Sequence, residues 1–189
     1  VGNYADSGES CTSFWTPFYD QNSQPALQAG DYLFIQFGHN DEKALTLAQY
    51  YAGLKRYVDD AKAKGAKPVL ITPVERNIWS GGVLTHSHGD FPATMKQLGI
   101  DTDTPCIDLT TSSYNLWSSL GQTVATTYFY PGDHTHPNQA GAMKIAGLVR
   151  DGVLALNLSP LAATYTRTTT PPLPAQPPAG LPAAGVYSL

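Results

Sequence analysis

The chain has 189 residues, enough for one domain with a sizeable hydrophobic core. Hydrophobic residues make up 42% of the chain, 14% are charged and the formal net charge is -4, which is typical of a globular rather than a disordered protein. No basic stretch or run of about 18 apolar residues occurs, so we expect neither a nucleic-acid partner nor a membrane span. The many Thr, Ser, Tyr, Gly and Pro residues favour a secreted, extracellular protein.

Apolar runs and helical periodicities alternate along the first third of the chain. Residues 1–16 are a loop rich in Gly, Ser and Asp, and a short helix is plausible at 24–29. Residues 32–37 form an almost continuous apolar run, typical of a strand buried on both faces. A helix is predicted over 45–64, where apolar residues recur every three or four positions, and Gly65 ends it.

The same alternation continues to about residue 156. In order, we expect a strand at 67–73, a loop at 74–90, a short helix at 91–98, a strand at 107–109 and helices at 112–120 and 138–156. Strands that alternate with helices predict a parallel sheet covered by helices on both faces, which is a three-layer α/β/α sandwich.

The composition changes near residue 159. Thr, Pro and Ala dominate residues 166–189, a pattern typical of a linker or tail with polyproline character. We therefore divide the chain into a domain at 1–160 and a tail at 161–189, and we expect the tail to add little to the core.

The loop Gly132-Asp133-His134-Thr135-His136-Pro137 holds an acid and a base three positions apart. A free imidazole titrates near pH ~6.5, so His136 is suited to accept a proton near neutral pH. Asp133 can hold that ring in one tautomer and stabilise it when it becomes charged. An alternative to this catalytic interpretation is a simple turn that carries an exposed histidine. The loop alone is about equally compatible with both.

A second polar segment follows the apolar run at 32–37. It reads Gly38-His39-Asn40-Asp41, and polar groups just past the carboxyl end of a strand are where open α/β sheets keep their chemistry. The Asn40 amide can donate to a developing oxyanion. His39 is expected to support the turn, and Asp41 to cap the helix that follows.

These two segments resemble the sequence blocks of SGNH (GDSL-type) hydrolases. Gly38-His39-Asn40-Asp41 is similar to their G-x-N-D block, Asp133-x-x-His136 is similar to their D-x-x-H block, and both variants are similar to those of the rhamnogalacturonan acetylesterase branch. Residues 3–10 resemble the second block of that branch, in which a glycine amide, here Gly8, completes the oxyanion hole. The resemblance runs from about residue 2 to about residue 156.

The resemblance implies an esterase that removes O-acetyl groups from a polysaccharide such as pectin by Ser-His-Asp acyl transfer. It implies Asp133, His136, Asn40 and Gly8 as the catalytic residues of this chain, and no cofactor. Two other classes stay open: a non-catalytic binding or assembly module of the same fold, and a lipid or aryl ester hydrolase.

The nucleophile of that family is a serine after the first strand, and the expected strand is not visible. Asp6-Ser7 is the only Asp-Ser pair, but residues 1–5 are too short and polar for a central strand, and residues 8–30 contain no convincing one. We therefore expect the fold to lack its first strand within this chain. The serine would then come from an upstream segment or a second polypeptide, which leaves a strand position empty beside 33–37.

Other chemistry is less favoured. The pairs His86/His88 and His134/His136, with Asp133, offer ligand types that zinc accepts, but histidines two apart on irregular loops are not preorganised, so we expect no metal. Trp79 and Trp117 could stack on sugar rings, although core packing is the more common role of such residues. For the two cysteines, Cys11 and Cys106, a disulfide and free thiols both stay open.

Overall fold

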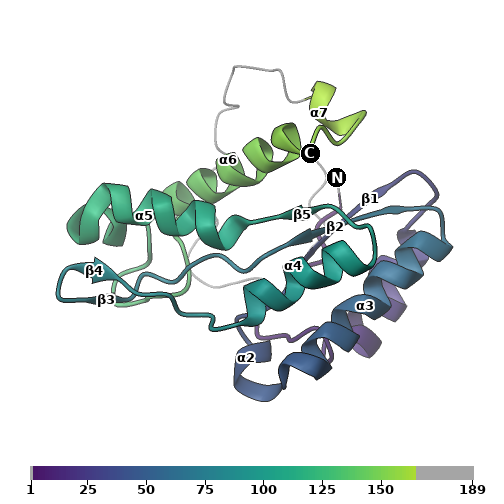
Figure 1. The fold of residues 1–189 in the computed structure, drawn as a ribbon, viewed down its shortest axis with the longest axis horizontal. Helices are drawn as coiled ribbons and strands as arrows, with labels where there is room; N and C mark the ends of the chain where they lie inside the picture. The colour runs from purple at the N-terminus through teal and green to yellow at the C-terminus, as the bar shows by residue number, and fades with distance from the viewer. Residues whose placement is uncertain (1, 165–189) are drawn as a thin grey trace. The chain divides into compact units, whose positions relative to one another are not determined.

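The computed structural model describes residues 2–164 and contains a parallel sheet (Figure 1). The strand order is β1 (Tyr32–Gln36), β2 (Lys67–Ile71), β5 (Cys106–Ile107). β1 and β2 run parallel, with Tyr32 opposite Lys67 and Gln36 opposite Ile71. Parallel pairing of these two strands is what the sequence predicted.

The pairing between β2 and β5 is parallel as well. The Leu70 amide donates to the Pro105 carbonyl (2.9 Å), and the Thr72 amide donates to the Ile107 carbonyl (3.1 Å). Donors and acceptors advance in the same direction along the two strands, which defines a parallel ladder. The predicted α/β fold with a parallel sheet is therefore confirmed.

Two compact units make up the described chain. Residues 2–71 and 93–106 form the first unit, and residues 72–92 and 107–164 form the second. The described chain passes between the units directly after β2, near the start of the helix at Phe91–Asp101, and within β5. The predicted domain boundary at 160 stays a prediction.

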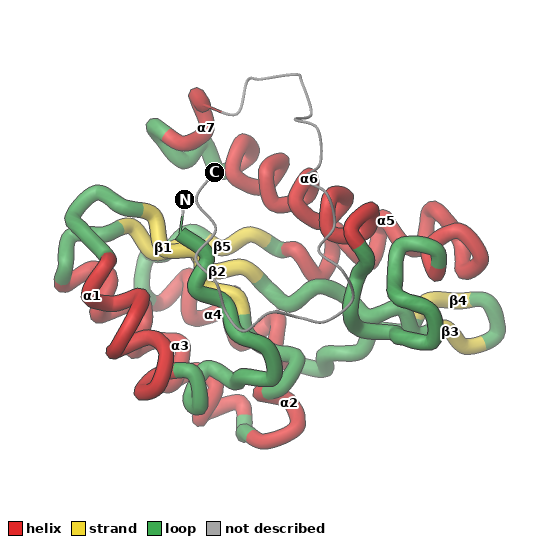
Figure 2. Tube along the Cα trace, turned by 180° about the vertical axis from the view of Figure 1, so that it is seen from behind, coloured by secondary structure: helices red, strands yellow, loops and turns green. Residues whose placement is uncertain are grey.

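The first unit contains most of the N-terminal helices. η1 (Trp15–Ser23, a π-helix), α1 (Gln24–Ala26), α2 (Asp41–Ala44), α3 (Leu47–Ala63) and most of α4 (Phe91–Asp101) belong to it. Of these, α3 contacts both β1 and β2. Seen from both sides, α3 and α4 lie along the same side of β1 and β2 (Figures 1 and 2). This is the arrangement that right-handed crossovers in one direction along a sheet produce.

The long helix α3 is fixed by its cap and its buried face. The Thr46 hydroxyl accepts from the Gln49 amide, and the Gln49 side chain accepts from the Thr46 amide, which forms a capping box. Its buried residues follow the predicted apolar periodicity: Tyr50, Leu54, Tyr57, Val58 and Ala61. The Tyr50 hydroxyl donates to the Phe37 carbonyl (2.9 Å), so the helix is also held to the end of β1.

The second unit consists of a hairpin and three helices. These are β3 (Trp79–Ser80), β4 (Val83–Leu84), α5 (Leu109–Thr126), α6 (Gln139–Ala155) and α7 (Leu161–Thr164). Leu84 from the hairpin, Trp117 and Ala125 from α5 and Phe129 form its buried cluster. The hairpin lies inside the predicted loop at 74–90. α5 begins three residues before the predicted helix at 112–120, and Gly121 (φ +74°, ψ +160°) interrupts it directly after the predicted end. Trp117 is fully buried, so it stacks on no sugar.

The remaining sequence expectations concern the tail and the cysteines. The first four residues of the predicted tail form α7, and residues 165–189 lie outside the described range. Cys11 and Cys106 are both free thiols, Cys11 buried and Cys106 half-buried. Among residues 2–164, none of the helices has the length and apolar character needed to cross a membrane.

Close packing at Gly141 gives a first testable prediction. A Cβ at this position in the first turn of α6 would lie 2.1 Å from the Tyr128 carbonyl oxygen, which accepts from the Asn138 amide. We expect Gly141→Ala to lower the melting temperature by roughly 5 °C, because overpacking costs about 1–3 kcal/mol. Calorimetry or thermal circular dichroism measures it.

Gly147 of the same helix is the matched control. A Cβ there meets nothing within 4 Å outside the helix backbone. Gly147→Ala should leave the melting temperature unchanged or raise it slightly, because alanine favours a helix over glycine by ~0.5–1 kcal/mol. Equal melting temperatures for the two variants would contradict the packing described at Gly141.

Candidate active site

Asp133 and His136 form an acid–base pair on the turn between α5 and α6. One carboxylate oxygen, Oδ1, accepts from the amides of Thr135 (2.7 Å) and His136 (2.9 Å). The other, Oδ2, lies 2.7 Å from His136 Nδ1. A carboxylate can only accept, so Nδ1 carries the proton and Nε2 presents a lone pair. One oxygen thus holds the turn while the other orients the ring.

These hydrogen bonds also hold the carboxylate in its ionised form. The backbone amides of His136 and Thr135, followed by the His136 side chain, lower the pKa of Asp133 to about 2. A depressed carboxyl pKa stabilises the folded state above the unfolded value of ~4, and this contribution is lost as pH falls through about 2. Asp133 therefore stays charged at any pH at which the imidazole can act as a base.

The base is open to solvent. The side chain of His136 is 67% exposed and that of Asp133 is 33% exposed. Among the described residues, no hydrogen bond occupies His136 Nε2, which leaves this atom accessible to a reacting hydroxyl.

The turn is closed at its base by backbone pairing. The Tyr130 amide donates to the His136 carbonyl (3.2 Å), and Phe129 and Pro137 form an antiparallel bridge. Asn138 then begins α6: its Oδ1 accepts from the Gly141 amide (3.1 Å), which caps the helix. The acid–base pair therefore lies on a short closed loop directly before a capped helix.

The two expected oxyanion donors are brought together in the first unit. The Asn40 side chain follows β1, and its Nδ2 donates to the Glu9 carbonyl (3.2 Å). Gly8 precedes Glu9 in a turn with φ +86°, a conformation that favours glycine. The Gly8 amide makes no hydrogen bond to another residue in the described range. The Asn40 amide is therefore held against the residue that follows Gly8.

Asp41 builds this half of the site, which corrects the sequence interpretation. Although it is the first residue of α2, its carboxylate caps no helix, and Thr46 caps α3. The side chain is fully buried: Oδ1 accepts from the Cys11 amide (2.8 Å) and Oδ2 from the Gly38 amide (2.9 Å). It thereby joins the segment after β1 to the segment that contains Gly8. The sequence feature that could have indicated this role is the position of Asp41 in the G-x-N-D block.

The expected convergence of the two halves stays a prediction. Gly8 and Asn40 belong to the first unit, whereas Asp133 and His136 belong to the second. Ser7, the serine weighed as an internal nucleophile, makes no hydrogen bond within residues 2–164.

The other histidines have different surroundings. His88 is buried, and its Nε2 lies 2.8 Å from the Val74 carbonyl. His86 is exposed, stacks on Tyr114 and places Nδ1 3.3 Å from the Glu75 carboxylate. Within the described part of the chain, no three His, Cys, Asp or Glu side chains are arranged to hold a metal ion.

Comparison with known proteins gives a family and several relatives. The GDSL-like Lipase/Acylhydrolase family matches residues 2–144. The chain is 34% identical over 175 residues to the rhamnogalacturonan acetylesterase RhgT of Bacillus subtilis (strain 168), covering 84% of this chain and 75% of that protein. It is 25% identical over 194 residues to the rhamnogalacturonan acetylesterase of Emericella nidulans, covering 89% of this chain and 78% of that protein.

Solved structures show the same fold. The crystal structure of YxiM from Bacillus subtilis superposes with a TM-score of 0.76 at 25% identity, covering 83% of this chain and 46% of that chain. This chain thus spans about half of that structure's length. Axe2, an acetylxylan esterase from Geobacillus stearothermophilus, superposes with a TM-score of 0.63 at 18% identity, covering 78% of this chain and 68% of that chain.

Proposed function

The chain belongs to the GDSL-like lipase/acylhydrolase family, and we propose that it removes O-acetyl groups from a carbohydrate such as rhamnogalacturonan. Its relatives named as acetylesterases support a carboxylic ester hydrolase with a carbohydrate substrate. The observation that carries the proposal furthest is the 2.7 Å contact between His136 Nδ1 and Asp133 Oδ2, with Nε2 left open. A polysaccharide substrate of the plant cell wall favours an extracellular site of action.

The proposed reaction is acyl transfer through a serine. His136 Nε2 takes the proton from the serine hydroxyl while its oxygen attacks the acetyl carbonyl, and the imidazolium returns that proton to the departing sugar oxygen. Water then attacks the acetyl-serine in the same way and releases acetate. Asp133 stabilises the imidazolium in both steps.

The negative charge that develops on the carbonyl oxygen is assigned to the first unit. Asn40 Nδ2 and the Gly8 amide would donate to this oxygen, and such donors act most strongly where the charge develops. Asp41 supports both by fixing the backbone around them. The roles of Asp133, His136, Asn40 and Gly8 are those that the matching motif positions have in the family.

The serine is proposed to lie outside residues 1–189. Among the described strands, β1 lies at the edge of the sheet, so a further strand could pair along its outer side. A further strand beside β1 would end next to Gly38 and Asn40, which is where a nucleophile must be presented. An upstream segment or a second polypeptide would supply this strand and its serine.

Acetate release from the protein in its full natural length tests the proposal. Three substrates are compared: acetylated rhamnogalacturonan, acetylated xylan and a long-chain aryl ester. Their relative rates distinguish a carbohydrate esterase from a lipid or aryl ester hydrolase. We expect turnover of an acetylated polysaccharide and labelling of one serine by a fluorophosphonate, located by peptide mass spectrometry. Binding of the polysaccharide with neither acetate release nor labelling would contradict the proposal and favour a non-catalytic module.

A further inference from the structure

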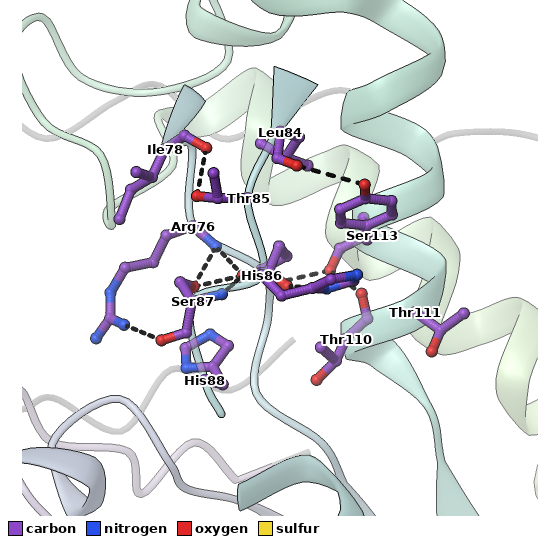
Figure 3. A network of polar contacts seen from close by, with 12 residues as sticks. Arg76, Ile78, Leu84, Thr85, His86, Ser87, His88, Thr110, Thr111 and Ser113 are labelled. Atoms are coloured by element: carbon purple, nitrogen blue, oxygen red, sulfur yellow. Dashed lines mark hydrogen bonds and ion pairs between the residues drawn. The ribbon is translucent and has the colours of Figure 1, made fainter. Parts of the chain in front are cut away.

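Arg76 lies buried between two loops of the second unit. Only 8% of the residue is exposed. Its Nε donates to the Thr135 hydroxyl oxygen (3.3 Å), and its Nη1 donates to the Ser87 carbonyl (3.4 Å), the second contact being visible in Figure 3. One guanidinium therefore connects the end of the β3–β4 hairpin to the turn that carries Asp133 and His136.

A buried carboxylate makes the hairpin side of this connection rigid. Glu75 is fully buried, and its Oε1 accepts from the Ser87 amide (2.8 Å), from the Ser87 hydroxyl and from the Arg76 amide (3.3 Å). Its own amide donates to the Ser113 hydroxyl oxygen of α5 (2.9 Å). The polar groups that surround Ser87 thus fix the carbonyl to which Arg76 is bound (Figure 3).

The acid–base turn is tied to the same segment through its two middle residues. The Asn77 amide donates to the His134 carbonyl (2.8 Å), and His134 Nδ1 lies 2.9 Å from the Asn77 carbonyl, to which it must donate. Thr135 receives Arg76 on its hydroxyl, and its own amide donates to Asp133 Oδ1 (2.7 Å). The exposed pair is thereby oriented by the two residues that lie between its members.

We propose that Arg76 is a positioning residue for the Asp133–His136 pair and that it acts through the Thr135 hydroxyl. The planar guanidinium offers donors in a fixed geometry, so it can hold two acceptors on different loops at once. Errors of about 1 Å in the placement of a catalytic group can lower rates on the order of 100-fold. The hydrogen bond between Arg76 and Thr135 can therefore affect the rate. The kinetic part of this inference rests on the proposed function, whereas the structural part does not.

Substitution of Thr135 gives the cleanest test. Thr135→Val keeps the shape of the side chain but removes the acceptor, and Thr135→Ser restores the acceptor. We expect Thr135→Val to raise the titration midpoint of Asp133 by about one pH unit above its wild-type value of about 2, because the Thr135 amide is held less well, as measured by carboxyl ¹³C NMR. Thr135→Ser should keep the wild-type midpoint. The control Arg150→Gln should keep it too, because the Arg150 side chain is exposed and pairs with Asp151.

A double-mutant cycle identifies Arg76 as the origin of the effect. Arg76→Lys should raise the Asp133 midpoint on its own but add nothing in the Thr135→Val background, because the contact is already lost. Additive shifts, or an unchanged midpoint in Thr135→Val with the protein folded, would overturn the proposal. Since Arg76 also holds Ser87, the threonine variants keep the proposal testable if Arg76→Lys folds poorly.

Kinetics separate a positioning role from a merely structural one. On the acetylated substrate we expect Thr135→Val to lower kcat about tenfold with KM nearly unchanged, and Thr135→Ser to recover the rate. A loss confined to KM, or no loss, would contradict positioning. If the wild-type protein hydrolyses no ester but the Asp133 midpoints change as described, the proposed function is wrong. The conclusion that Arg76 orients Asp133 through Thr135 is then still supported.

Discussion

Replacement of His136 by alanine is expected to lower kcat for ester hydrolysis on the order of 10⁴-fold or more, the largest effect of any single substitution in this chain. The variant loses the atom that removes the proton from the nucleophile, and no other described side chain hydrogen-bonds to Asp133 Oδ2. The backbone contacts of Asp133 do not depend on the ring, so the fold should be kept. Acetate release at saturating substrate measures the loss.

His86 provides the matched control for this substitution. It is another exposed histidine of the same unit, 70% exposed at the side chain, and its Nδ1 also faces a carboxylate, that of Glu75. His86→Ala should keep kcat within about twofold of wild type, because Glu75 retains its backbone and hydroxyl donors. More than a tenth of the wild-type activity in His136→Ala would exclude His136 as the general base.

The second large effect is expected at Asn40. Asn40→Ala should lower kcat by roughly 10²–10³-fold and change KM far less, because a hydrogen bond to the oxyanion strengthens as charge develops. The side chain also donates to the Glu9 carbonyl, so the segment around Gly8 becomes less well held, which acts in the same direction. Steady-state kinetics on an acetylated oligosaccharide give both constants.

Asn22 of η1 serves as its control, since its side chain donates only weakly to the Pro17 carbonyl, at 3.5 Å. Asn22→Ala should reproduce wild-type kinetics. A loss in Asn40→Ala that appears in KM while kcat is kept would argue for substrate binding by Asn40 and against its role as an oxyanion donor.

Much of the fold could be predicted because its elements have strong local patterns. The apolar run at 32–37 and the periodicity of residues 45–64 became β1 and α3 within a few residues. The hairpin of β3 and β4 was missed because each strand has only two residues, too few for an alternating pattern. The predicted end of the helix at residue 120 is confirmed, because the non-helical backbone of Gly121 (φ +74°, ψ +160°) interrupts α5 there and a second helical stretch follows to Thr126.

The last helix shows a second limit of periodicity. α6 was placed correctly, but Leu156, spaced three residues from the buried Val153, is 41% exposed, and Ala142 is exposed as well. Apolar spacing identifies a helix and a face, yet it does not say how much of that face other segments cover.

Some residues of the candidate site could be predicted from the sequence, and others could not. Asp133, His136 and Asn40 could be predicted because each lies in a short sequence motif, the first two in Asp133-x-x-His136 and the third in Gly38-His39-Asn40-Asp41. The contact between Arg76 and Thr135 joins residues 59 positions apart, and Arg76 belongs to no motif that the sequence analysis identified, so no local pattern could reveal the contact. Asp41 was visible in its motif but was assigned to a helix cap, because one of its two partners, the Cys11 amide, lies 30 positions away.

A crystal structure of the full-length protein after reaction with an acetyl-like phosphonate tests the central claim most directly. The phosphorus mimics the tetrahedral intermediate, so its surroundings reveal which groups act on the ester. We predict phosphorus bonded to a serine outside residues 1–189, its oxygen within about 3 Å of Asn40 Nδ2 and the Gly8 amide, and that serine's oxygen within reach of His136 Nε2. Phosphorus on Ser7, or a phosphonyl oxygen remote from Asn40 and Gly8, would contradict the account.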